Sequence, residues 1–217
     1  MFEPNALGQL MEIIGELNEA FFPAQIIGAI IALVLVYLCF VKPSPMSSNL
    51  MKFLLAVIHG INGYGTAMCA IRLGIAFYMF ESILESVVAI IFLLDIFLQK
   101  FEFRLPQRND LKIWSLILII WGVFMYPLTE ILLGYRWPEI AVFGAICPTT
   151  IFTIGLLITA LEKPDTSLSL KVLILLLSIG AVIIGGRIAI LGGLFDIAYF
   201  ASGICGIVFL IKYWNKA

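Results

Sequence analysis

The sequence predicts an all-α fold, a polytopic bundle of about seven transmembrane helices preceded by a short amphipathic helix. Of the 217 residues, 62% are hydrophobic and 12% are charged. Soluble domains carry roughly 45–50% apolar and about 25% charged residues, so too few polar side chains exist to coat a globule of this size. Apolar runs long enough to cross a hydrocarbon core about 30 Å thick recur along the chain. When these runs are taken as spans, the lysines all fall on one side of the bundle.

The first predicted element is an interfacial amphipathic helix over residues 5–20. Its apolar side chains recur at helical spacing, opposite three glutamates. An acidic helix gains nothing from anionic lipid, so two roles remain open: a passive anchor at the interface, or a cover over the outer ends of other helices. The apolar positions are Leu7, Leu10, Met11, Ile14 and Leu17, and the acidic positions are Glu12, Glu16 and Glu19.

Seven apolar runs follow, and turn or charge signals mark the breaks between them. About 20 residues make a span, because each adds about 1.5 Å along a helix. The weakest boundary lies around 71–76, where Arg72 is the only charge. No soluble domain interrupts the runs, so residues 1–217 are predicted to form a single membrane domain. The spans lie near 22–41, 50–70, 77–98, 112–133, 138–161, 168–185 and 194–213.

The loop charges predict the orientation. If the loops alternate between two sides, ten lysines and arginines fall on one side and three arginines on the other. Because basic loops stay in the cytoplasm, we expect the N-terminus outside, the C-terminus in the cytoplasm and the protein in the cell (inner) membrane. The first 21 residues hold no lysine or arginine, so we expect the first span to be a retained helix and not a signal peptide. The larger group is Lys42, Lys52, Lys100, Arg104, Arg108, Lys112, Lys163, Lys171, Lys212 and Lys216, and the smaller is Arg72, Arg136 and Arg187.

Composition also disfavours several function classes. The net charge is −1 and no basic patch is present, so nucleic acid is not an expected partner. No metal-ligand cluster, Ser/His/Asp set or phosphate loop occurs, so we expect no enzyme activity, no metal and no cofactor. The expected partners are membrane lipids and either further copies of the chain or other membrane subunits. Four isolated cysteines are predicted to pack as small hydrophobes: Cys39, Cys69, Cys147 and Cys205.

Three acids lie within the third span, where ionisable groups are costly. At about 100° per residue, Glu81, Glu85 and Asp95 share one stripe of the helix. One interpretation is a path for a cation or a proton along this face. The other pairs Glu81 with an outer arginine and lets Asp95 reach the cytoplasmic interface near Lys100. Glu85, roughly two turns into the span, is harder to explain as a surface group.

Each outer arginine has acids close to it in the sequence, and a guanidinium group pairs well with carboxylates. Two interpretations remain open: ion pairs that fix the outer rim of the bundle, and a solvated vestibule that binds a polar solute. Asp196 has a further option, as a cap of the last helix. The expected pairs are Arg72 with Glu81 and Glu85, Arg136 with Glu130 and Glu139, and Arg187 with Asp196.

Prolines and a lone histidine complete the polar features within spans. Proline frees a backbone carbonyl, so kinks at Pro127 and at Cys147-Pro-Thr-Thr150 are expected either to line a small solute site or to serve packing alone. The only histidine, His59, stands in the glycine-rich segment 59–65. Glycines permit close helix approach there, and His59 and Asn62 can hydrogen-bond to a neighbouring helix.

The run 143–157 carries the most specific motif, Phe-Gly-x-x-Cys-Pro-Thr-Thr-Ile-Phe-Thr-x-Gly-Leu-Leu. With this motif the chain resembles a family of small bacterial multi-pass membrane proteins that is known only as a domain of unknown function. The resemblance covers most of the chain and implies the membrane topology, but no mechanism. Weaker similarity lies at Phe22-Pro-Ala-Gln25, around His59, and at Tyr126-Pro-Leu128, Gly134-Tyr-Arg136, Trp137-Pro138 and Ile184-Gly-Gly186.

Together these features predict a small permease or channel with an outward-facing polar site for an ion or a small polar solute. The alternative is a non-catalytic membrane subunit or anchor of a larger complex, in which the same groups serve packing. The residues of the predicted site are Glu85, Glu130, Arg136, Glu139, Cys147, Pro148, Thr149, Thr150 and His59.

Overall fold

The computed structural model describes residues 6–162 and 167–214, and the regular secondary structure within these ranges is helical. The described residues contain no strand beyond one isolated bridge between Phe143 and Ala145, so the predicted all-α fold is confirmed. The elements are α1 (Ala6–Val41), α2 (Pro45–Leu73), α3 (Ala76–Leu98), α4 (Asn109–Ile120), η1 (Trp121–Met125), α5 (Tyr126–Leu132), α6 (Ile146–Thr159), η2 (Ala160–Glu162), α7 (Leu168–Ile190), η3 (Leu194–Asp196) and α8 (Ile197–Tyr213).

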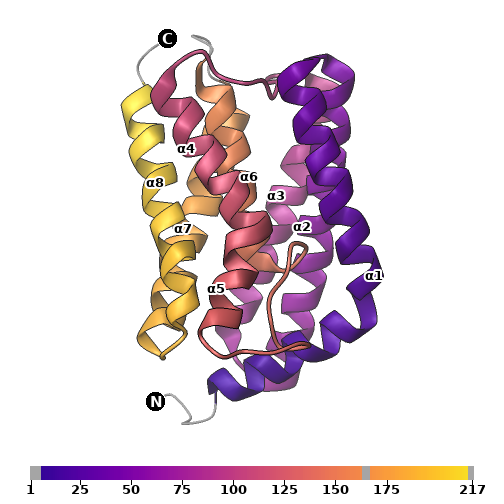
Figure 1. The fold of residues 1–217 in the computed structure, drawn as a ribbon, viewed down its shortest axis with the longest axis vertical. Coiled ribbons are helices and arrows are strands. Elements are labelled where there is room, and N and C mark those ends of the chain that lie inside the picture. Colours follow the sequence, from indigo (N-terminus) through magenta and orange to yellow (C-terminus); the bar gives the residue numbers. More distant parts are fainter. Residues whose placement is uncertain (1–5, 163–166, 215–217) are drawn as a thin grey trace.

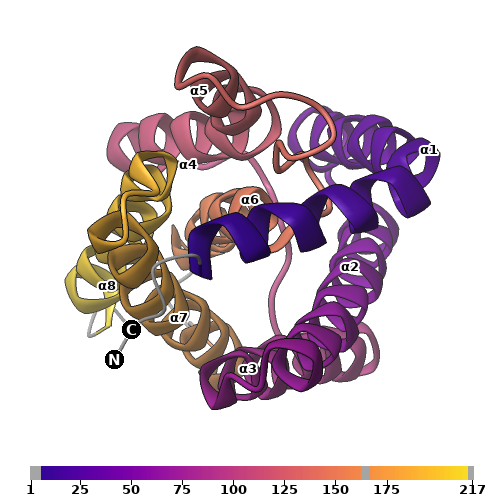
Figure 2. The same cartoon turned by 90° about the horizontal axis from the view of Figure 1, so that it is seen from below.

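Helix α6 stands at the centre of a ring made by the other helices, as the view along the bundle in Figure 2 shows. Every residue of 148–159 is buried, so this helix presents no face to the surroundings. Small residues let its neighbours approach closely. A Cβ on Gly155 would lie 2.9 Å from the Cβ of Leu118, and one on Gly122 would lie 2.5 Å from the carbonyl oxygen of Pro148. The polar groups of α6 are therefore held inside the protein.

Helix α1 bends and lies across one end of the ring (Figures 1 and 2). The predicted helix over 5–20 and the predicted span near 22–41 are thus parts of one continuous helix over the described residues. Pro23 lies inside it, where the missing amide hydrogen allows a bend without a break. The side chains of Leu7 and Leu10 lie outside the described set, but Met11 is buried as predicted. The N-terminal part of α1 covers the ends of other helices, which was one of the two expected roles.

Five helices among residues 6–162 and 167–214 are long and apolar enough to cross a membrane. They cover Met11–Val41, Pro45–Arg72, Asn109–Leu132, Leu168–Ile190 and Leu194–Tyr213, and a shorter apolar helix covers Ile146–Glu162. Their outer faces carry many exposed large apolar side chains, which suits contact with hydrocarbon and not with water. The coarse prediction of several membrane-type helices therefore agrees with the structure.

The predicted span near 138–161 begins later than expected. Residues 138–145 are irregular, and helix α6 starts only at Ile146. Gly144 has φ +107°, a left-handed conformation that a right-handed α-helix does not contain. Helix α6 therefore cannot extend toward the N-terminus through this residue. Pro148 consequently lies in the first turn of α6, where its missing N–H needs no partner, and the expected mid-helix kink at this proline is wrong.

The two ends of the bundle differ in charge. The end that α1 crosses holds Arg72, in the last turn of α2, Arg136, in the segment before α6, and Arg187, in the last turn of α7. Lys163 and Lys216 lie outside the described residues. The remaining members of the larger basic group lie at the other end: Lys42, Lys52, Lys100, Arg104, Arg108, Lys112, Lys171 and Lys212.

Candidate functional site

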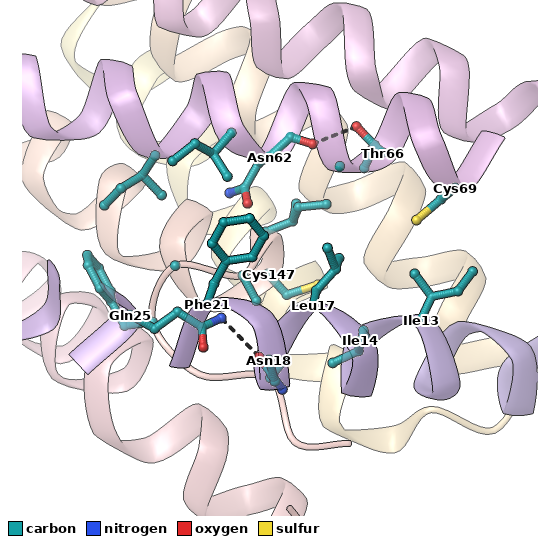
Figure 3. A pocket seen from close by; sticks show the side chains of 18 of the residues that line it. Ile13, Ile14, Leu17, Asn18, Phe21, Gln25, Asn62, Thr66, Cys69 and Cys147 are labelled. Carbon is teal, nitrogen blue, oxygen red and sulfur yellow. Dashed lines mark hydrogen bonds between the residues drawn. The ribbon is translucent and has the colours of Figure 1, made fainter. Parts of the chain in front are cut away.

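A cavity of about 260 Å³ lies at the end of the bundle that α1 crosses (Figure 3). Its walls come from α1, α2, α3, α5, α7 and η3, and from the segment 141–147 that leads into α6. Most of the lining side chains are apolar, and no lysine or arginine lines the cavity within the described residues. The cavity is therefore a largely apolar chamber, and its few polar groups are acids, amides and hydroxyls.

Three acids from three different elements face this cavity: Glu81 of α3, Glu130 of α5 and Asp196 of η3. Their exposed fractions are 3%, 0% and 0%. Ionised carboxylates are costly in a dry interior unless a cation or several hydrogen bonds compensate them. With no basic side chain in the lining, each acid must hold a proton or face a bound cation.

The three acids differ in their hydrogen-bond partners. The backbone N–H of Ala141 donates to Oε2 of Glu130 at 2.5 Å, whereas Oε1 of Glu130 has no partner. The hydroxyl of Tyr126 donates to Oδ1 of Asp196, and the Cys147 thiol lies beside the same carboxyl group. Glu81 has neither a hydrogen bond nor an ion pair within residues 6–162 and 167–214. The cavity thus exposes hydrogen-bonding capacity that the protein itself leaves unused.

Amide side chains extend this polar lining (Figure 3). Asn62 of α2 is buried and points into the cavity, and its Nδ2 has no hydrogen-bond acceptor. Gln25 of α1 donates from Nε2 to Oδ1 of Asn18 at 2.9 Å, while its own Oε1 has no partner. Unpaired buried polar atoms are uncommon in folded proteins and call for an explanation. A polar ligand in the cavity would supply the missing partners.

The N-terminal part of α1 closes the cavity at the end of the bundle. Nδ2 of Asn18 donates to the carbonyl oxygens of Pro138 and Ile140 at 2.6 and 2.7 Å, which joins α1 to the irregular segment before α6. An exposed ion pair of 2.5 Å between Glu16 and Arg72 joins it to the end of α2. Such exposed pairs contribute little, so Asn18 is the stronger attachment.

These contacts correct the expected arginine pairs. Arg72 was predicted to pair with Glu81 or Glu85 and instead pairs with Glu16. The Arg187 guanidinium lies 4.3 Å from the ring centre of Phe77. Asp196 was a predicted partner of Arg187 or a cap of the last helix, but it accepts from Tyr126 and makes no side-chain cap bond.

Two predicted site residues form a separate cluster inside the bundle. Nδ1 of His59 and Oε2 of Glu85 are 2.5 Å apart, and Nε2 of His59 lies 3.1 Å from the hydroxyl of Thr153. All three side chains are buried and none lines the cavity. His59 therefore joins α2, α3 and α6 in an interhelical contact, and Glu85 lies in this contact and not in the lining of the cavity.

Hydrogen-bond directions fix how many protons this cluster holds. The Thr153 hydroxyl donates to the carbonyl oxygen of Thr149 at 2.8 Å, so it can only accept from Nε2–H of His59. The contact between Nδ1 and Glu85 then needs a second proton, carried by either group. The histidine and the carboxyl group together are neutral, which explains how they are tolerated at this depth.

The other predicted site residues are divided between the cavity and its surroundings. Glu130 and Cys147 line the cavity. Arg136 and Glu139 are exposed, line no part of it and make no ion pair with Glu130, because the chain between α5 and α6 turns them outward. Pro148, Thr149 and Thr150 are buried in the first turns of α6 beneath it, where the Thr149 hydroxyl accepts from the N–H of Gly144 at 3.0 Å.

The predicted acidic stripe of α3 is split into three independent sites. Asp95 was expected near Lys100 at the interface, but it is buried and forms an ion pair of 2.7 Å with the equally buried Lys52. The backbone N–H of Lys100 adds a longer bond of 3.3 Å to Asp95. Glu85 is bound to His59, so Glu81 alone faces the cavity, and no continuous path links the three acids.

The predicted site omits several groups that line the cavity: Glu81, Asp196, Asn62, Asn18 and Tyr126. Glu81 and Asp196 carried a signal, because both are acids within apolar segments, but sequence spacing assigned each to an arginine. Asn62 carried a weaker signal, because it lies in the glycine-rich segment 59–65. Asn18 and Tyr126 are unremarkable in sequence, since only the bend of α1 and the packing of α5 bring them to the cavity.

The fold and the cavity together define an all-helical protein with several helices of membrane-spanning length and a cavity at the end that α1 crosses. Within that class, the chain belongs to DUF6064, a family of unknown function, whose family model matches residues 7–216. This membership confirms the resemblance to an uncharacterised family. No curated protein and no solved structure matches the chain.

Proposed function

We propose that the protein is a small permease of the cell membrane that binds a cationic solute in the cavity under α1. The observation that carries the proposal is the convergence of Glu81, Glu130 and Asp196 on one chamber whose described lining holds no basic side chain. Unpaired acceptors at Glu130 and Gln25 add to this preference for a donor or a cation.

The orientation follows from the charge difference between the two ends. The lysine-rich end is assigned to the cytoplasm, which puts the cavity and the N-terminal part of α1 on the outer side. Seven membrane crossings in the inner membrane of the cell fit this assignment. The solute would therefore be received from outside, as expected for an outward-facing site.

The same geometry indicates how a solute would enter the cavity and which residues would block its passage to the cytoplasmic side. Release of the Asn18 contacts would free α1 from the segment 138–140 and open the chamber to the outer side. On the cytoplasmic side the path is blocked by the buried cluster of Glu85, His59 and Thr153. Passage of a solute therefore requires alternate opening at the two ends, as in a permease, and not a permanent pore.

Charge balance links the solute to protons. Three acids buried without a basic partner are stable as carboxylic acids, so a bound cation must displace a proton from at least one of them. Exchange of one cation for one proton leaves the charge of the chamber unchanged. We therefore expect the solute to be taken up in exchange for protons.

Uptake into proteoliposomes tests the proposal, with radiolabelled guanidinium, which stays charged and so does not cross the bilayer as a neutral base, as the probe and an imposed proton gradient, inside acidic. Glu81→Gln and Glu130→Gln should each reduce uptake at least tenfold, because the neutral amides cannot balance a cation. Glu12→Gln is the matched control, since Glu12 is an exposed acid of the same end and lines no cavity. Its uptake should equal that of the unmodified protein.

Uptake by the unmodified protein at the rate of protein-free liposomes would refute the permease. Equal uptake in Glu81→Gln and the unmodified protein would refute the role of the acidic chamber. Stable co-purification of further membrane chains, together with absent uptake, would support a subunit of a larger complex instead.

A further inference from the structure

We infer that the solute is an amphiphilic cation, an ammonium group on a hydrocarbon chain, and that it reaches the cavity sideways from the bilayer between α1 and α2. This inference rests on the proposed function, because it names the class of solute for the same chamber. It follows from the apolar lining, from a thin part of the cavity wall and from the depth of that part in the bilayer.

The chamber is far more apolar than a site for a small hydrated ion requires. Its three acids lie on α3, α5 and η3, whereas most of the lining residues that α1 and α2 contribute are not polar. Ile14 and Leu17 of α1 and Ile58 and Ile61 of α2 are among its lining residues. A solute that fills this volume must bury a hydrocarbon portion, since apolar surface left facing a polar solute gains nothing.

Side chains in one part of the wall line the cavity and also form part of the outer surface. Phe21 of α1 and Ile61 and Tyr64 of α2 all line the chamber, yet 47%, 50% and 69% of these residues is exposed. The wall between α1 and α2 is therefore a single layer of side chains. Rotation of one or two of these side chains would join the chamber to the outside of the bundle.

Glycines widen the gap between the two helices at this place. Gly28 of α1 lines the cavity, and a Cβ built on it would meet no atom within 4 Å. Gly65 of α2 also lines the cavity, and its Cβ would meet only the end of the Leu17 side chain at 3.9 Å. A larger residue would fit at both positions. The gap therefore results from the two glycines as well as from the arrangement of the helices.

The depth of this wall decides what can enter through it. Ile61 lies about 16 Å along α2 from Arg72 at the end of the helix, at a rise of about 1.5 Å per residue. The hydrocarbon core of a bilayer is about 30 Å thick, so Ile61 and Gly28 lie among acyl chains and not in water. A solute that enters here must first dissolve in the bilayer, which an alkylammonium ion does and a hydrated metal ion does not.

The head group of such a solute has suitable acceptors inside. Oε1 of Glu130 and Oε1 of Gln25 are buried acceptors without a donor, and the carboxyl group of Glu81 has no partner among the described residues. An ammonium group carries up to three N–H donors and one positive charge. It can donate to an oxygen of this set, while its chain fills the space beside Ile14, Leu17 and Ile58.

Calorimetric binding to the purified protein in nanodiscs tests the inference, with methyl-, butyl-, hexyl- and octylammonium as probes and empty nanodiscs as the blank. Burial of each added methylene should tighten binding about fourfold. Gly28→Trp, which fills the gap, should weaken octylammonium binding at least tenfold. Val34→Trp is the matched control, because Val34 is an exposed position of the same helix and lines no cavity.

The outcomes separate this inference from the proposed function. If methylammonium binds as tightly as octylammonium, or if Gly28→Trp and Gly65→Leu bind octylammonium like the unmodified protein, the amphiphile is refuted and the cation site stands. If Glu81→Gln leaves the affinity for every probe unchanged, or no probe binds, the cation site itself is refuted. Thermal melting followed by circular dichroism shows which variants are folded, and Gly65→Leu replaces Gly28→Trp if the latter is not.

Discussion

At the scale of single residues, the main question is how ionisable side chains are tolerated inside the bundle. Two buried pairs answer it by mutual compensation: His59 with Glu85, and Lys52 with Asp95. In each pair, loss of one partner leaves the other without compensation, which is more harmful than loss of both. Glu81 differs from these acids because no described residue compensates it, so its burial makes sense only with a proton or a ligand.

The His59–Glu85 pair gives a prediction at this scale. His59→Ala should lower the free energy of unfolding by about 3 kcal/mol, because Glu85 remains buried without its partner. The double variant His59→Ala, Glu85→Ala should be less destabilised than the sum of the two single variants. Unfolding in mixed micelles, followed by circular dichroism, measures all four corners of this cycle. Additive losses would show that the two side chains do not interact.

At the scale of elements, the bend of α1 and the shortness of α6 produce the cavity together. Helix α6 begins at Ile146, about halfway into the bundle, and so leaves a space at the end that α1 crosses. The segment 138–145 fills part of this space without forming a helix. The N-terminal part of α1 closes the rest, so the chamber lies between a helix end and a crossing helix.

Substitution of Asn18 tests how firmly the N-terminal part of α1 is held over the chamber. Asn18→Ala removes both hydrogen bonds to the segment 138–140, so backbone amides in the N-terminal part of α1 should exchange with deuterium at least tenfold faster. Glu19→Ala, at the exposed neighbouring position, should leave exchange unchanged. Hydrogen–deuterium exchange with mass spectrometry detects the difference. Equal protection in the two variants would mean that packing alone holds α1 in place.

At the scale of the whole molecule, the arrangement of charge predicts a fixed orientation in the membrane. The described lysines all lie at one end, and the end with the cavity has only arginines as its basic residues among residues 6–162 and 167–214. Such an asymmetry is the main determinant of topology in helical membrane proteins. The site, the crossing helix and the proposed route all depend on it.

Single-cysteine labelling tests this orientation in intact cells. In a chain whose four native cysteines are replaced by alanine, Glu139→Cys should react with a membrane-impermeant maleimide. Met46→Cys, at the opposite end and 72% exposed, should react only after permeabilisation. The reverse pattern would place the chamber on the cytoplasmic side and contradict the outward-facing permease.

Much of the fold follows from local features that are visible in the sequence. The apolar runs around α2, α4 with α5, α7 and α8 are long and uninterrupted, so hydropathy finds them. The start of α6 was missed because residues 138–145 are as apolar as the helix that follows. Hydropathy measures the environment of a segment and not its backbone conformation, and here the apolar part of the loop is partly buried and the helix is buried.

The candidate site was predictable only in part. Glu130 and Cys147 were found because an acid and a proline-linked cysteine within apolar runs are conspicuous. Arg136 and Glu139 were included because they are neighbours of Glu130 in sequence, yet the turn at 134–138 directs them outward. Sequence proximity brings residues into the same loop, but it does not determine which way their side chains point.

By itself the sequence determined that this is an all-helical chain with membrane-spanning segments, because the hydrophobicity and length of each helix are local properties. Only the tertiary structure decided that Glu81, Glu130 and Asp196 meet in one chamber while Glu85 and Asp95 are bound elsewhere. The physical reason is that the rotation of each helix is set by packing against its neighbours. That packing depends on contacts between residues far apart in the chain, such as Gly155 against Leu118 and Asn18 against Pro138.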